Sequence, residues 1–193
     1  ALGNYTLKGS VTDNQGQVQT GFNGSVYVSI FDKPTNVPPV TPPPGVPPAF
    51  NIQNNIVAKV RATVTNGRFA ADFIVPKDLN YDMGKGKISY YANSDTKDAN
   101  GLDTTVNVGG VNQQAGSDDE PPVVKAYIDN DKFHNGGVTG PNPMLYVQLS
   151  DNNGINVSGS SVGHDLVAIL DGDIQDPINL NDYYQTKEGD FSQ

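Results

Sequence analysis

The chain contains no cysteine and no tryptophan, and it is poor in basic residues. Without cysteine, its 193 residues hold no disulfide framework, no thiolate zinc site and no cysteine nucleophile. Twelve Lys and Arg face 21 Asp and Glu, which leaves a net charge of −9. Nucleic acid and anionic lipid both require clustered cations, so neither is expected as a partner.

Long apolar runs are also missing. No stretch approaches the roughly 20 apolar residues of a membrane-spanning helix, so no membrane span is expected. Residues 1–4 carry neither a basic segment nor an apolar segment of a leader peptide. If the protein is exported, we expect its signal to lie outside these residues.

Turn-forming residues are abundant. The chain has 21 Gly and 14 Pro, and its hydrophobic content is 36%. The apolar residues are Val, Ile, Phe and Tyr more than Leu, and these side chains suit a pleated, half-buried surface. Many short strands separated by turns are therefore expected, and the predicted fold class is all-β.

Residues 1–110 predict an immunoglobulin-like β-sandwich, with six or seven short strands between turn residues. Apolar side chains on both alternating sets of residues 26–31 predict a strand covered on both faces. The segments 56–65 and 68–75 flank Asn66-Gly67, the pair that best accepts the positive φ angles of a type I′ hairpin. Residues 34–48 are Pro-rich, which predicts a long surface loop or, alternatively, a recognition segment for a partner groove.

Residues 111–122 have the composition of a linker, because almost nothing in them is apolar and they end in an acidic run plus prolines. A second β module is predicted over residues 123–193. It shows only three or four candidate strands, which is few for a self-sufficient sandwich. We therefore expect this module to be incomplete, or its strands to dock on the first module.

Catalysis is not expected from the two histidines. His164 stands beside Asp165, as in a catalytic pair, but no cysteine exists and the nearby serines lack a nucleophile-elbow pattern. His164 also opens an apolar strand, where a structural histidine is common. His134 lies in a Gly-rich stretch and is predicted to be a turn residue.

Two sets of residues are candidates for binding. Calcium prefers six to eight oxygen ligands, so acidic loops converging at the module junction could hold it, although a solvated acidic surface is the simpler interpretation. No other cofactor is expected. The candidate calcium ligands are Asp118, Asp119, Asp129 and Asp131.

The second candidate is the aromatic pair Tyr183 and Tyr184. These rings could form a carbohydrate platform or, equally, cap a core.

Several short motifs, in order, resemble a known family. In the second half they are Phe133-His134-Asn135-Gly136-Gly137-Val138-Thr139, Asn142-Pro143, Leu149-Ser150-Asp151-Asn152-Asn153-Gly154-Ile155-Asn156, Gly163-His164-Asp165-Leu166, Leu170-Asp171-Gly172-Asp173 and Leu180-Asn181-Asp182-Tyr183-Tyr184. In the first half they are Phe31-Asp32-Lys33-Pro34, Asn66-Gly67-Arg68-Phe69, Val75-Pro76-Lys77-Asp78, Ile88-Ser89-Tyr90-Tyr91-Ala92 and Val108-Gly109-Gly110. Together they resemble the post-catalytic region of the type IX secretion system sortase, a gingipain-like cysteine peptidase of the Bacteroidota cell surface.

The resemblance implies a non-catalytic accessory region of an enzyme that removes sorting signals from secreted cargo and anchors the cargo at the cell surface. The peptidase domain, with its Cys and His, would lie upstream in the same chain. The implied partners are that domain and other secretion-system or outer-membrane components, and the implied location is the outer membrane or cell surface of an exporting cell. The family pattern also continues past Gln193. The alternative is a free-standing adhesion or carbohydrate-binding module.

Overall fold

A computed structural model describes residues 3–38, 49–75, 81–112, 120–155 and 165–187. Statements about the structure refer to these residues. The linker prediction for 111–122 and the loop prediction for 34–48 fall largely outside them, as do Asp118, Asp119 and His164. No helix in the described part is long and apolar enough to cross a membrane.

The all-β prediction is confirmed, because the described residues form short strands and a single 3-10 turn. In residues 3–112 the strands are β1 (Gly3–Ser10), β2 (Gly24–Phe31), β3 (Thr35–Val37), β4 (Phe50–Ile52), β5 (Ile56–Val64), β6 (Arg68–Val75), β7 (Gly84–Lys85), β8 (Lys87–Asn93), β9 (Asp98–Asp103) and β10 (Asn107–Val108). In residues 120–187 they are β11 (Val123–Ile128), β12 (Leu145–Ser150), β13 (Val167–Ala168) and β14 (Ile178–Asn179), followed by the 3-10 turn η1 (Asn181–Tyr183).

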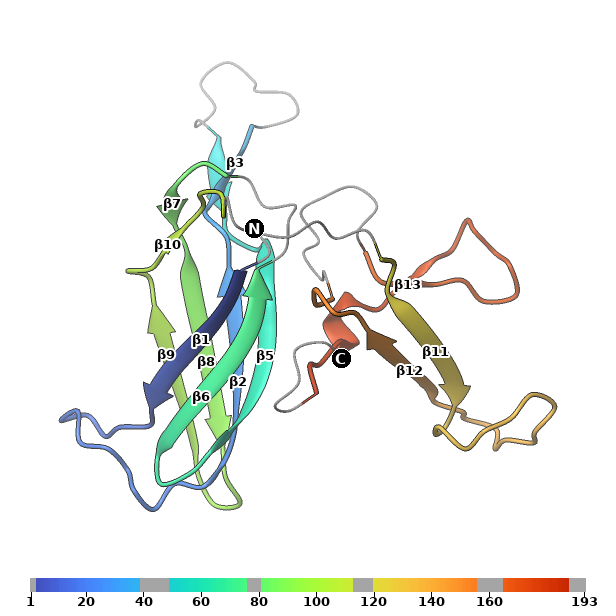
Figure 1. Cartoon of the computed structure of the whole chain (residues 1–193), viewed down its shortest axis with the longest axis horizontal. Coiled ribbons are helices and arrows are strands. Elements are labelled where there is room, and N and C mark those ends of the chain that lie inside the picture. The colour runs from blue at the N-terminus through green and yellow to red at the C-terminus, as the bar shows by residue number, and fades with distance from the viewer. Residues whose placement is uncertain (1–2, 39–48, 76–80, 113–119, 156–164, 188–193) are drawn as a thin grey trace.

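Two antiparallel sheets face each other in the first region. One has the strand order β5-β2-β8-β9 and the other pairs β1 with β6. Figure 1 shows β1 and β6 passing in front of β2 and β8. Shorter pairs, β3 with β4 and β7 with β10, extend one end of this sandwich.

The core lies between the two sheets, because alternate side chains of each strand point inward. On the central strand β2, the side chains of Val26, Val28 and Ile30 are at most 4% exposed. Leu7, Phe69, Phe73 and Val75 of the other sheet pack against this cluster. The sandwich prediction for this region is therefore confirmed.

The expectation that β2 is covered by a layer on both faces is only half right. Its outward rings, Tyr27 and Phe31, are half-buried beneath cationic side chains of neighbouring strands. The guanidinium of Arg61 lies 5.6 Å from the Tyr27 ring centre, and the ammonium of Lys87 lies 4.1 Å from that of Phe31. Long side chains with apolar stems can shield a ring without a second layer of backbone.

The turn at Asn66-Gly67 forms as predicted, but the hairpin does not continue beyond it. Asn66 and Gly67 have φ angles of 51° and 72°, and Thr65 and Arg68 exchange two backbone hydrogen bonds. Past that bridge, β5 and β6 diverge and join opposite sheets. Local turn chemistry set the reversal, whereas the competing partners β2 and β1 determined which sheet each strand enters.

The second region consists of two ribbons, β11 with β12 and β13 with β14. None of its described residues is buried. The region touches the sandwich at β5, where the backbone N–H of Arg61 donates to Oγ1 of Thr186 at 3.2 Å. Lys59 Nζ lies 3.2 Å from the Asn181 carbonyl oxygen and 3.5 Å from Asp182 Oδ1. These contacts join the segment that follows β14 to β5, and both expectations for the second module, incompleteness and docking of its strands, stay predictions.

Candidate functional site

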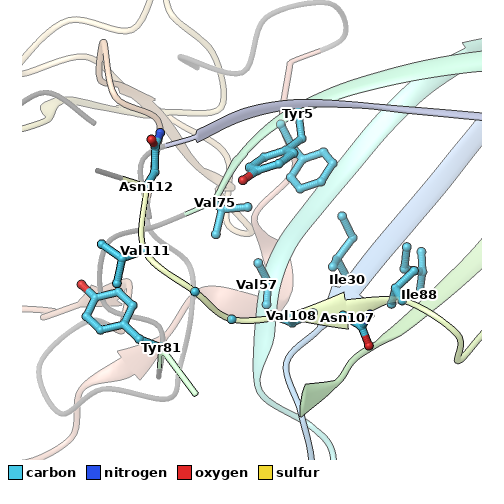
Figure 2. Close-up of a pocket in the computed structure, with 14 residues that line it drawn as sticks. Tyr5, Ile30, Val57, Val75, Tyr81, Ile88, Asn107, Val108, Val111 and Asn112 are labelled. Atoms are coloured by element: carbon cyan, nitrogen blue, oxygen red, sulfur yellow. The ribbon is translucent and has the colours of Figure 1, made fainter. Parts of the chain in front are cut away.

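One end of the sandwich holds an apolar cavity of about 440 Å³ between the two sheets (Figure 2). Figure 2 shows Tyr81, Val111 and Asn112 gathered at one end of it, and Ile30 and Ile88 at the other. Its lining consists of Tyr5, Ile30, Val57, Phe73, Val75, Tyr81, Ile88, Val106, Asn107, Val108, Gly109, Gly110, Val111 and Asn112.

A β-bulge shapes one wall of this cavity. On β5, Ala58 pairs with Ile30 and Ile56 pairs with Phe31, so Val57 is an extra residue opposite the pair. A bulge re-aims the side chain of the inserted residue. Val57 is accordingly 3% exposed and lines the cavity, although strict alternation would place it beside its outward neighbours.

Glycines allow the opposite wall to close in. Gly109 has a φ of 131°, and a Cβ there would lie 2.3 Å from the carbonyl oxygen of Asp82. The N–H of Gly110 donates to the carbonyl oxygen of Tyr81 at 2.7 Å. A side chain at position 109 would clash with that carbonyl, and both glycines have positive φ angles that other residues rarely adopt, so this turn requires glycine.

The lining of the cavity is mostly apolar. Its described lining contains no carboxylate, amine, imidazole or thiol, and its polar atoms are tyrosine hydroxyls, asparagine amides and backbone groups. An apolar pocket with a few polar atoms at its rim suits an apolar side chain or small molecule.

The structure describes Asp129 and Asp131, two of the four candidate calcium ligands. Among the described residues, no three His, Cys, Asp or Glu side chains gather closely enough to hold a metal ion. Both oxygens of Asp129 accept hydrogen bonds within its own loop, from Thr139 Oγ1 at 2.6 Å and from the Met144 N–H at 2.9 Å. These bonds hold the pKa of Asp129 below its usual range. With Asp118 and Asp119 outside the described residues, calcium binding stays a prediction.

Tyr183 and Tyr184 differ in exposure. Tyr183 ends η1 with its side chain 78% exposed, whereas Tyr184 has an extended backbone and a half-buried ring. Burial raises the pKa of Tyr184 to about 12. Tyr183 is therefore the more accessible ring of the two, and a binding role for the pair stays a prediction.

His134 is an exposed turn residue, as predicted, and its carbonyl oxygen accepts a hydrogen bond from the Gly137 N–H at 2.9 Å.

The sequence interpretation overlooked the outward face of the four-stranded sheet. There Tyr27, Tyr91 and Arg61 stand side by side on three neighbouring strands. The tyrosine ring centres are 6.3 Å apart, and Arg61 also donates to Ser25 Oγ at 3.1 Å. The outward side of each strand was visible in the sequence, but the pairing of strands more than 30 residues apart was not.

Comparison with known proteins finds a likeness to a solved structure. No family model matches the chain, and neither does any curated protein. The chain is similar to a solved structure described as dimeric latent PorU from Porphyromonas gingivalis, with 31% identity and a TM-score of 0.56. The likeness covers 95% of this chain but only 17% of the PorU chain, so these residues are similar to a small region of PorU.

Proposed function

We propose that the chain is a non-catalytic accessory β region of a cell-surface, gingipain-like sortase that processes and anchors secreted cargo. The observation that carries this proposal is the likeness to PorU, which extends over nearly the whole chain at 31% identity. The ordered motifs that resemble the type IX sortase support the same assignment. The proposed location is the outer membrane or cell surface.

The chemistry of the chain is consistent with an accessory role. A cysteine peptidase requires a thiolate nucleophile, and these 193 residues contain no cysteine. The nucleophile of the parent enzyme would therefore come from outside them, from the proposed upstream peptidase domain. That domain, and other secretion-system or outer-membrane components, are the proposed partners.

The second region supports the prediction that module 123–193 is incomplete. Because β11 and β12 pair in register, the side chains of Val124, Ala126 and Ile128 stand beside Leu149, Val147 and Leu145 on one face. Val124 and Leu145 on that face are exposed. An apolar ribbon of two strands is marginal by itself, so we propose that further strands of the parent chain cover it.

The test is an in-frame deletion of residues 1–193 from the parent gene. We expect secreted cargo to keep its sorting signal and to appear in the medium, as it would when the peptidase cysteine is replaced by alanine. The control is the deletion strain after the coding sequence for residues 1–193 has been put back at its original position. Mass spectrometry of the cargo C-terminus provides the measurement.

Two outcomes would overturn the proposal. One is a parent gene without any peptidase domain. The other is cleavage of a sorting-signal peptide by the purified 193-residue chain. Normal cargo processing after the deletion would instead favour the alternative, a free-standing adhesion or carbohydrate-binding module.

A further inference from the structure

The sequence contains five Asn-Gly pairs, which begin at Asn23, Asn66, Asn100, Asn135 and Asn153. An Asn-Gly pair can react with itself, because glycine has no side chain to hinder the attack of its backbone nitrogen on the side-chain carbonyl carbon of the asparagine. A new C–N bond closes a succinimide ring, and the bond to the side-chain amide nitrogen breaks. That nitrogen leaves as ammonia with the glycine N–H proton, and water then opens the ring to aspartate or isoaspartate.

The reaction requires a glycine N–H that is not held in a hydrogen bond and a backbone that can bring its nitrogen to the side chain. An intramolecular attack is fast only when the two reacting atoms can meet in the right geometry. A pair held by backbone hydrogen bonds must first open locally, and that opening costs free energy. The fold can therefore rank five pairs that are alike in sequence.

The pairs at Asn23 and Asn66 restrain each other. The N–H of Gly67 donates to the carbonyl oxygen of Phe22 at 2.8 Å, and Gly67 is buried. The N–H of Asn66 donates to Oδ1 of Asn23 at 2.9 Å, which occupies the side chain of the other pair. Gly24 is the first residue of β2 and lies in its ladder with β5. Neither pair can close a succinimide ring without opening these contacts.

Two further pairs are also restrained by the backbone. The N–H of Gly154 donates to the carbonyl oxygen of Asp151 at 3.2 Å, and the N–H of Asn153 donates to Oδ1 of the same aspartate at 2.7 Å. Asn100 and Gly101 are exposed, but they lie within β9 in its ladder with β8. Because a strand keeps its backbone extended, ring closure at Asn100 requires that ladder to open.

The pair at Asn135 differs from the other four. It lies in the loop between β11 and β12, which extends past the end of that ribbon (Figure 1). The N–H of Gly137 donates to the carbonyl oxygen of His134 at 2.9 Å and closes a turn around the pair. Asn135 and Gly136 are exposed, and a Cβ on Gly136 would meet nothing within 4 Å. Within the described part of the chain, neither the Asn135 side chain nor the Gly136 N–H has a hydrogen-bond partner.

We propose, independently of the accessory role, that Asn135-Gly136 is a site of spontaneous deamidation in the folded protein and that the fold protects the other four pairs. The modification replaces a neutral amide with a carboxylate, so it adds a negative charge to the loop. Isoaspartate also inserts an extra methylene into the backbone of the turn. The modified turn is the one that connects the two strands of the β11–β12 ribbon.

Incubation of the 193-residue chain in mildly alkaline buffer tests the proposal. Peptide mapping with mass spectrometry follows the loss of the amide at each pair and distinguishes aspartate from isoaspartate. We expect Asn135 to convert about tenfold faster than any of the other four, because a local opening that costs about 1.4 kcal/mol slows a reaction tenfold. In concentrated urea the five pairs should convert at similar rates, since the fold no longer restrains them.

Asn135→Gln and Asn100→Gln are matched variants, because each replaces an exposed asparagine with an amide that closes its larger ring slowly. Asn135→Gln should remove most of the acidic species that appear first on ion-exchange chromatography, whereas Asn100→Gln should leave them unchanged. The proposal is overturned if Asn135 converts no faster than Asn100 in the folded chain, or if Asn135→Gln leaves the acidic species in place. An equally large lead of Asn135 in urea would also overturn it, because the ranking would then not come from the fold.

Discussion

Residues 3–112 and 120–187 are both built from strands with alternating apolar side chains, but they differ in burial. Among the described residues, the first region has thirteen buried hydrophobic side chains, from Val11 to Ala92, whereas no residue of the second is buried. The β11–β12 ribbon has an apolar face as regular as that of β2, yet among the described residues no sheet lies against it. Period-two patterning makes a strand, and only an opposing layer converts its apolar face into a core.

The sharpest contrast between the regions comes from two turn glycines. Gly67 and Gly172 have similar φ angles, 72° and 78°, but a Cβ on Gly67 would lie 2.4 Å from the Gln19 carbonyl oxygen, whereas Gly172 has nothing within 4 Å. We expect Gly67→Ala to lower the free energy of unfolding by about 3 kcal/mol, from a left-handed alanine plus overpacking. Gly172→Ala should cost about 1 kcal/mol. Urea denaturation measures both, and equal losses would contradict the comparison.

Two valines test the difference in burial directly. Val28 is 1% exposed in the first region, and Val138 is 97% exposed in the second. Val28→Ala should lower the free energy of unfolding by about 2 kcal/mol, since two buried methyl groups are lost and a cavity remains. Val138→Ala should leave it unchanged. A measurable loss from Val138→Ala would mean that the second region has a core after all.

Alkaline pH probes the most buried tyrosine of the second region's last segment. The pKa of Tyr184 is raised from 10 to about 12 in the folded chain. Its contribution to the free energy of unfolding is therefore complete below pH 10 and is lost as the pH rises toward 12. The loss should reach about 2 kcal/mol by pH 12. Tyr184→Phe should remove that part of the alkaline destabilisation, and Tyr183→Phe should not. Urea midpoints at pH 8 and pH 11.5 give the comparison.

The smallest effect concerns the loop that follows β11. Hydrogen bonds from Thr139 and Met144 lower the pKa of Asp129. The contribution of this carboxylate to the stability of the fold is therefore present above the ordinary pKa of 3.8 and is lost as the pH falls below it. Asp129→Asn should lower the melting temperature slightly at pH 6 and flatten its acid dependence. Asp131→Asn removes the same charge from the same loop as a control. If the melting temperatures of the two variants depend on pH in the same way, the hydrogen bonds of Asp129 do not stabilise this loop.

Much of the fold could be predicted from local pattern. Alternation identified the strands, and Asn66-Gly67 identified the reversal, because φ angles above zero are inexpensive only for such residues. The divergence of β5 and β6 into different sheets could not be predicted, since it depends on competition between distant partners. The bulge that turns Val57 into the cavity is likewise set by pairing with Ile30 and Phe31.

For the candidate sites too, the sequence indicated some features and only the structure showed others. Asp129 and the Tyr183–Tyr184 pair were candidates from the sequence, but the burial and hydrogen bonds of those side chains are known only from the fold. The row that joins Arg61, Tyr27 and Tyr91 was invisible in the sequence, because its members stand on strands brought together only by sheet register.

By itself, the sequence determined an all-β chain that lacks a cysteine nucleophile, since residue type and period-two spacing act over a few residues. The tertiary structure alone decided which strands share a sheet, which apolar face is covered and which side chains meet. Those outcomes depend on contacts between segments far apart in the chain, and no local pattern encodes the partner of a strand.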